Sequence, residues 1–268
     1  IMAFSTESLE FWHHAGLTPF HLARANAMTQ KVGCVDDDAI TQIADTVWWC
    51  GSTPQGGLSI FQWDGALSRV STPEIDSILI LAGASNISLS ALRFFGRSFV
   101  LIRAGATTLV YCVEEKMWHE WSTTTRLWFK TAGQSLAGTM VNYAVSNVST
   151  SGSVYLMNHA AHVFQDAGTT YTARVQLPPM DFGTKKTKFF HDMEIVCDEE
   201  ETSSVVNLLY TDDDYQTYTT HGASDLSNDR VRFTRLGSSR KRGWVITNSS
   251  NAPMRLEALE GTVTIGNH

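Results

Sequence analysis

The sequence predicts an all-β protein, with a β-propeller followed by a C-terminal antiparallel β-sandwich. First, the stretch from Ser98 to Trp121 contains three runs of alternating or β-branched residues, separated by Gly105-Ala106 and by a polar turn. Second, similar runs occur before and after it, at a spacing of roughly forty to fifty residues. Third, short strands alternate with turn residues from Lys188 to Ile265, as in a sandwich.

The three sets of runs predict three antiparallel meanders of the propeller type. One meander cannot bury its own apolar face, so it must pack against another. Asp64-Gly65 is a strong hairpin signal within the first set. The first meander is predicted at Thr46–Trp49, Leu58–Trp63 and Ala66–Val70, and the third at Tyr143–Val148, Ser153–Asn158 and His162–Gln165.

A short helix is predicted near residues 73–81, between the first two meanders. Thr72 can act as the N-cap residue of this helix. Pro73 suits the first helical position, since the N–H that proline lacks would have no partner there. A capping box of Ser71 with Glu74 is the alternative start. The apolar residues at helical spacing are Ile75, Ile78 and Leu79.

The remaining segments are predicted to be irregular or to mark a boundary. Phe4–Ile43 is expected to be irregular, and Ser135–Asn142 is expected to link the second and third meanders. A strand is predicted over Thr169–Leu177 and ends at Pro178-Pro179. The pattern of strands and turns in the sequence differs before and after these two prolines. We therefore expect propeller blades over residues 1–176 and a β-sandwich over residues 177–268, with a boundary slightly before Tyr171 as the alternative.

Composition indicates a globular chain. Of the 268 residues, 43% are hydrophobic and 18% are charged, and the formal net charge of −7 argues against a dedicated nucleic-acid binder. No apolar run reaches the roughly 20 residues of a membrane span, and no signal peptide is evident. Because the chain begins with Ile1, we expect it to be a fragment.

The four cysteines are predicted to be buried free thiols of a protein made in a reducing compartment, since none forms a Cys-x-x-Cys pair. They are Cys34, Cys50, Cys112 and Cys197.

One basic cluster is the candidate contact site for DNA or a partner protein. It consists of Arg235, Arg240, Lys241 and Arg242, flanked by Gly237 and Gly243. The alternative is a hairpin tip whose charges face water. The same two interpretations apply to Lys185, Lys186 and Lys188.

No catalytic, cofactor or metal residue is predicted. Gly133–Ala137 loosely resembles a nucleophile elbow, but its surroundings are β rather than α/β. His159 and His162 have a metal-ligand spacing but lack further ligands. Asp212–Asp214 favours an acidic tight turn, with a calcium site left open.

Several short sequence motifs, many of them containing aromatic residues or glycine, follow one another in a definite order between about Ser8 and Gly237. They are Ser8–Gly16, Gly33-Cys34, Asp45–Gly51 with Gly65, Arg69–Ile75, Phe99–Leu101, Thr108–Tyr111, Trp118–Glu120, and Arg230–Arg232 with Leu236-Gly237.

This ordered set resembles the tail hub or nozzle proteins of short-tailed bacteriophages, the packaged-DNA stabilisation family. The chain departs from the family at Cys112-Val113-Glu114, where the family usually has an Asp. It is also shorter than usual, so we expect an incomplete propeller with further blades N-terminal to it.

The resemblance implies a non-enzymatic protein of the virion tail, made and assembled in the host cytoplasm. Six copies would form a ring below the portal or an adaptor protein and anchor fibre, spike or needle proteins. Double-stranded DNA would pass through the ring without sequence recognition. The alternative from another class is a propeller that binds or cleaves glycans, like a sialidase, for which no paired carboxylates can be assigned.

Overall fold

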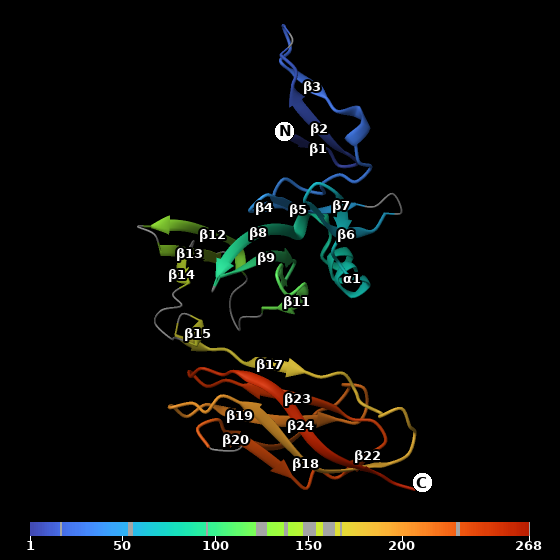
Figure 1. The fold of residues 1–268 in the computed structure, drawn as a ribbon, viewed down its shortest axis with the longest axis vertical. Helices are drawn as coiled ribbons and strands as arrows, with labels where there is room; N and C mark the ends of the chain where they lie inside the picture. Colours follow the sequence, from blue (N-terminus) through green and yellow to red (C-terminus); the bar gives the residue numbers. More distant parts are fainter. Residues whose placement is uncertain are drawn as a thin grey trace. The chain divides into compact units, whose positions relative to one another are not determined.

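A computed structural model describes residues 1–16, 18–52, 56–94, 96–121, 128–136, 139–146, 154–157, 164–166, 168–228 and 231–267 (Figure 1). The chain divides into two compact units, Ile1–Asn158 and His159–His268. Antiparallel strands dominate both, which confirms the predicted all-β class. No helix in the described part of the chain is long and apolar enough to cross a membrane.

The first unit opens with a three-stranded sheet where irregular chain was expected. The sheet consists of β1 (Met2–Phe4), β2 (Leu9–His14) and β3 (Leu22–Arg24). Its aromatic residues pack on the next sheet: Phe4 contacts Trp49 and Phe11 contacts Trp63. The strands are short and their burial depends on that neighbour, so local alternation was too weak to reveal them.

The second sheet is the first predicted meander with one strand added. It contains β4 (Ile40–Ile43), β5 (Thr46–Ser52), β6 (Leu58–Trp63) and β7 (Leu67–Arg69) in that order. The added strand, β4, precedes a two-residue turn in which Ala44 has φ of 51°. The predicted hairpin at Asp64-Gly65 is present, and Gly65 has φ of 109°, which glycine adopts without strain.

Helix α1 (Pro73–Ala82) matches the predicted helix, with Thr72 as its N-cap residue and Pro73 in its first turn. Ile75 and Leu79 are buried on its predicted apolar face. Ser71 has a different role from the alternative capping box. Its hydroxyl donates to Asp76 and accepts the backbone N–H of Ile60, so it ties the helix to β6.

The third sheet contains the central meander and another added strand. Its order is β8 (Ile87–Phe94), β9 (Arg97–Ala104), β10 (Thr107–Cys112) and β11 (Met117–Glu120). The strand that sequence reasoning missed is β8, whose first residues alternate apolar side chains with Ser88 and Ser90. In the structure this serine face is buried as well, at 2% and 7% exposure, so both faces of β8 are largely covered.

The first strands of successive sheets lie side by side, as in a propeller whose inner strands surround an axis. β8 lies beside β4 and beside β12 (Trp128–Leu136). The backbone N–H of Leu89 donates to Asp38 O at 2.9 Å, and Asn142 Nδ2 donates to Arg93 O at 2.8 Å. One buried cluster, which includes Trp48, joins the β4–β7 and β8–β11 sheets.

The third predicted meander has a different register in the structure. β12 pairs with β13 (Thr139–Ser146), which pairs with β14 (Val154–Met157). The expected linker at 135–142 is therefore the end of one strand and the start of the next, on either side of residues 137–138. Residues 147–153 and 158–163 of the predicted meander lie outside the described residues.

The second unit contains the predicted β-sandwich. Its core draws on both sheets, from Phe190 and Val231 on one to Val206 and Trp244 on the other. One sheet has the order β17 (Ala173–Gln176), β23 (Gly243–Asn248), β19 (Val205–Thr211), β20 (Thr219–Asp225). In the other, β18 (Lys188–Cys197) pairs with β21 (Val231–Thr234), β22 (Ser238–Ser239) and β24 (Leu256–Ile265).

The expected boundary between residues 176 and 177 falls inside this second unit. β17, which was assigned to the blades, pairs with β23 from Ala173↔Asn248 to Gln176↔Val245. The short pair β15 (Gln165–Asp166) and β16 (Thr169–Thr170) precedes it. The Pro178-Pro179 signal thus ends an edge strand of the sandwich, because proline cannot continue a hydrogen-bonded ladder.

The cysteines are free thiols. Cys34, Cys50 and Cys112 are buried as expected, whereas Cys197 is only partly covered. Burial raises the pKa of Cys50 to about 12, so its thiol stays neutral.

Candidate functional site

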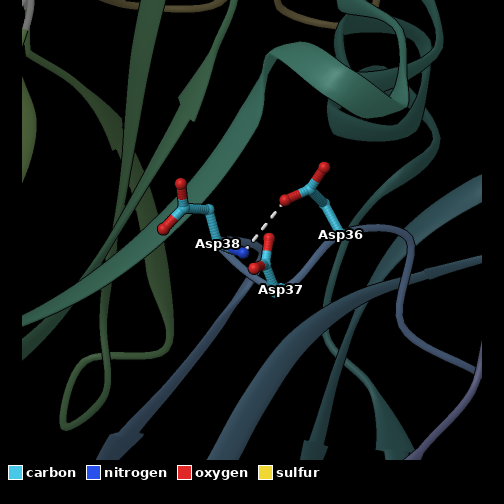
Figure 2. Close-up of side chains that lie close together, drawn as sticks. All are labelled: Asp36, Asp37 and Asp38. Atoms are coloured by element: carbon cyan, nitrogen blue, oxygen red, sulfur yellow. Dashed lines mark hydrogen bonds between the residues drawn. The ribbon is translucent and has the colours of Figure 1, made fainter.

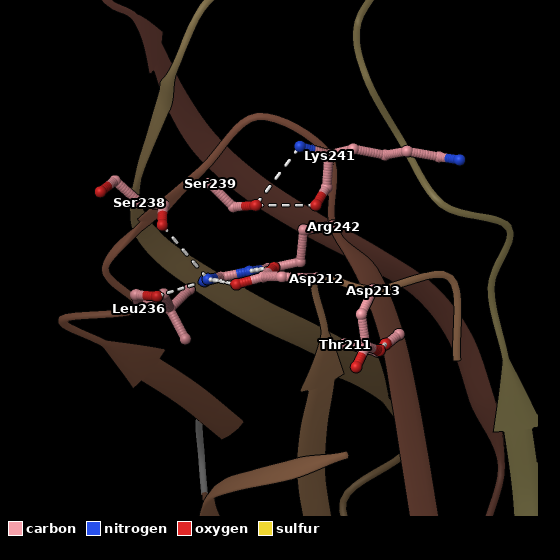
Figure 3. Close-up of polar contacts among 8 residues, drawn as sticks. All are labelled: Thr211, Asp212, Asp213, Leu236, Ser238, Ser239, Lys241 and Arg242. Atoms are coloured by element: carbon pink, nitrogen blue, oxygen red, sulfur yellow. Dashed lines mark hydrogen bonds and ion pairs between the residues drawn. The ribbon is translucent and has the colours of Figure 1, made fainter. Parts of the chain in front are cut away.

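The predicted basic cluster lies on loops that meet at one end of the sandwich. The loop of residues 235–242 enters β23, the turn of residues 212–217 follows β19, and the loop of residues 181–187 precedes β18. Figure 3 shows the contacts between the first two. The cluster is therefore one structural site, although its members have different roles.

Arg242 is the centre of this loop arrangement rather than a surface contact. Its side chain is only 3% exposed. Nε donates to Asp212 Oδ1 at 2.7 Å and Nη2 donates to Asp212 Oδ2 at 2.6 Å (Figure 3). The guanidinium also donates to the backbone carbonyls of Leu236 and Ser238.

Aromatic rings complete the environment of Arg242. Its Cζ lies 4.1 Å from the ring centroid of Tyr210, 5.0 Å from that of Phe190 and 5.4 Å from that of Trp244. A guanidinium matches both the planar carboxylate and the aromatic faces. Arg242 therefore stabilises the fold, and its prediction as a DNA or partner contact is corrected, because burial removes it from the surface.

Lys188 is also buried, with no exposed surface. Its Nζ donates to Thr184 O and, at 2.6 Å, to Arg240 O. One ammonium group thus ties two loops together, because its donors satisfy a carbonyl on each. The exposed Lys185 and Lys186 are consequently held near the exposed Arg240.

The other cations of the cluster face solvent. Lys241 Nζ forms an ion pair with Asp214, and its hydrogen bond with that carboxylate raises the pKa of Lys241. Arg235 is exposed and has φ of 60°, in the left-handed region. Lys185, Lys186, Arg235 and Arg240 form no ion pair with any residue that the structure describes.

The acidic triplet Asp212–Asp214 forms the predicted turn, and its carboxylates face different partners. Asp212 pairs with Arg242 and Asp214 with Lys241. Asp213 accepts from Thr217 and Thr211, and these hydrogen bonds lower its pKa to about 2. The open calcium interpretation gains no support, since the three groups do not converge.

A second acidic triplet, Asp36–Asp38, lies in the first unit and forms a turn before β4. Its carboxylate oxygens lie within 4.8 Å of one another. Asp36 Oδ1 accepts the backbone N–H of Asp38 at 3.0 Å (Figure 2). This contact is that of an Asx-type turn, in which an Asp side chain accepts from the backbone two residues on.

The remaining sequence candidates are structural or fall outside the described residues. Gly133–Leu136 lies within strand β12, which is not the strand-to-helix turn of a nucleophile elbow. His159 and His162 are outside the described residues. Trp48 and Trp49 are in the core, at 1% and 0% exposure.

Sequence reasoning missed an apolar hollow on the first sheet. It has a volume of about 650 Å³ and is lined mainly by exposed Ile1, Phe20 and Leu22 with Trp12 and His21. Phe20, which lies just before β3, is 79% exposed and forms part of this hollow.

Solved structures give only weak similarities. The exo-β-1,3-galactanase from Phanerochaete chrysosporium with galactose is 9% identical, with 99% of this chain and 80% of that chain covered and a TM-score of 0.27. A variant of it with β-1,3-galactotriose is 8% identical, with coverages of 97% and 75% and a TM-score of 0.30. A protein described as a glycoside hydrolase is 9% identical, with coverages of 97% and 70% and a TM-score of 0.25. Because these TM-scores are so low, the similarities support no conclusion about the fold or function of this chain.

No curated protein matches the sequence. A family model does match residues 1–129, and it is described as "Bacteriophage P22 Gp10, beta-propeller". The matched region ends within β12, so the phrases at Arg230–Gly237 lie beyond it. The match confirms the predicted propeller and the predicted resemblance: over residues 1–129 the chain is similar to the phage stabilisation family described by bacteriophage P22 Gp10.

Proposed function

We propose that the chain is a non-enzymatic hub or nozzle subunit of a short phage tail. Copies of the chain would form a closed ring that continues the DNA channel below the portal. The resemblance to the family implies six copies. The ring would retain packaged DNA and anchor fibres or a needle. The family match of residues 1–129 to a phage structural protein is the single observation that carries this proposal.

The negative net charge of the chain is suitable for the lining of a channel through which DNA passes. A formal net charge of −7 repels phosphates, so residues lining a bore would not retain the duplex by counterion release. Rings arise when each subunit offers two different surfaces that fit together and the rotation closes. The blades offer a rigid scaffold for such surfaces, since their sheets share one buried core.

Immunogold electron microscopy of intact particles of the encoding phage tests this function. The antibody is raised against the 268-residue chain, and its epitope is checked on denatured virions. Gold confined to the tail below the portal is expected. Absence of the chain from virion proteins, or gold only on the fibre tips, would overturn the hub proposal.

A further inference from the structure

The sandwich of the second unit carries opposite charges at its two ends. β18 begins at Lys188, beside the basic loops, and ends at Cys197, just before the acidic run of residues 198–201. The antiparallel partner β24 runs from Leu256 at the acidic end to Ile265 at the basic end. The charged loops are therefore separated by the length of a ten-residue strand, which is about 33 Å.

The basic end is defined by Lys185, Lys186, Arg235, Arg240 and Lys241. All five are exposed, and only Lys241 is paired with a carboxylate among the residues described. The buried cations organise this end. Lys188 joins the loops of residues 181–187 and 235–242, and Arg242 neutralises Asp212 from inside. The exposed positive charges are thus displayed on loops held by buried bonds.

The acidic end is defined by Asp198, Glu199, Glu200, Glu201 and Glu257. Its loop is also held in place: the backbone N–H of Glu200 donates to Leu226 O at 3.2 Å, and that of Asp198 donates to Arg255 O at 3.3 Å. Within the described part of this end, Arg255 is the cation, and Asp198 and Glu257 share it.

The partly covered thiol of Cys197 lies close to several carboxylates of this end. Burial raises the pKa of the Cys197 thiol, and the charges of Asp198, Glu200 and Glu257 raise it further. Carboxylates from the loop of residues 198–201 and from the start of β24 therefore act on the same thiol. The excess of negative charge is consequently a property of the folded end as well as of the linear sequence.

We propose that the basic end of one sandwich docks on the acidic end of the sandwich in a second copy. This head-to-tail contact rests on the proposed ring and names the surfaces that close it. Such heterologous contacts generate rings when the rotation closes, and complementary charge sets their register. A second copy is favoured over DNA because the complementary surface is present on the same chain, while a net charge of −7 repels a polyanion.

Two charge-reversal variants of the full 268-residue chain test the contact. The first carries Lys185→Glu and Lys186→Glu, which removes most of the positive charge of the basic end and leaves the acidic end unchanged. The second carries Glu199→Lys and Glu201→Lys, which removes most of the negative charge of the acidic end and leaves the basic end unchanged. These side chains are exposed, and circular dichroism verifies that each variant is folded. Matched controls carry Lys31→Glu with Lys116→Glu and Glu7→Lys with Glu120→Lys, all at exposed positions of the first unit.

Analytical ultracentrifugation at low and high salt measures the assembly. We expect the wild type and both controls to assemble, and each reversed variant alone to associate about 100-fold more weakly. An equimolar mixture of the two reversed variants should assemble again. The unchanged acidic end of the first variant then meets the unchanged basic end of the second, and at the other contact the new glutamates meet the new lysines. Attraction by net charge cannot explain such rescue, since both variants remain negative overall from a starting charge of −7.

Each other outcome identifies what fails. If the reversed variants assemble like the wild type, the head-to-tail contact is wrong while the ring stands. If the wild type stays monomeric, the ring itself is wrong, and the contact with it. Failure of the mixture to assemble overturns the pairing of the two ends. Loss of duplex DNA binding in the first variant, with assembly unchanged, would assign the basic end to DNA instead.

Discussion

Replacing Arg242 with methionine should destabilise the second unit far more than replacing its neighbour Lys241. Methionine keeps an apolar stem against the aromatic rings and removes the charge and all donors. Arg242 is 3% exposed, whereas the side chain of Lys241 is 47% exposed. The two variants lose the same formal charge from the same loop, so burial is the main difference.

The magnitude follows from the groups left behind. The buried Leu236 O loses its donor, which costs about 1 to 3 kcal/mol if it stays unsatisfied. Ser238 O belongs to an exposed residue, so water can replace its donor. Asp212 is 38% exposed, so water can solvate its carboxylate, and the loss stays below the limit for a fully buried pair. We expect Arg242→Met to lower the free energy of unfolding by about 3 kcal/mol.

Urea unfolding followed by the indole N–H signal of Trp244 in NMR measures this loss. Trp244 lies in the core beside Arg242 and reports on the second unit alone. A loss of about 3 kcal/mol should lower the urea midpoint by about 2 M, for a slope of about 1.5 kcal/mol per molar. A loss below about 1 kcal/mol for Arg242→Met, or an equal midpoint shift for Lys241→Met, would refute the buried-clamp reasoning.

Three further predictions concern packing, pH and thiol chemistry. Gly33→Ala should destabilise the first unit by at least about 2 kcal/mol in thermal unfolding, because the new Cβ would lie 2.2 Å from the backbone Ser5 O. The second unit should lose stability as pH falls from about 4 to 2, because hydrogen bonds hold the pKa of Asp213 at about 2 in the folded state; melting temperatures across this range measure the loss. In native protein Cys197 should react with an aromatic disulfide reagent before the other three cysteines, which are buried and should react only on unfolding.

Matched controls decide these predictions. Gly222→Ala should be tolerated, because its Cβ would meet only Phe233 at 3.9 Å, and an equal loss there would remove the steric argument for Gly33. The sign for Asp213 follows from its lowered pKa: its contribution is present above the unfolded pKa and disappears as the folded carboxylate is protonated. Asp213→Asn should therefore flatten the acid slope, and an unchanged slope contradicts the assignment. Reaction of more than one thiol in the native protein would contradict the burial pattern.

The sequence by itself determined the class of the fold and its local signals. Alternating and β-branched runs specify strands through the chemistry of single residues, and Pro73 after Thr72 specifies the start of α1 in the same way. The hairpin at Gly65 also needs only local geometry. Features that depend on near neighbours in the sequence could be predicted from it.

Tertiary structure alone decided the innermost strands and the character of the candidate site. β8 lies between other strands, and its Ser88 and Ser90, which alternation alone would place in solvent, are buried there. Arg242 and Lys241 are adjacent and both cationic, yet only the fold brings Asp212 and Tyr210 around the first and leaves the second in water. Burial of a charge depends on partners distant in sequence, and for that reason local patterns could place the basic cluster but could not assign its members their roles.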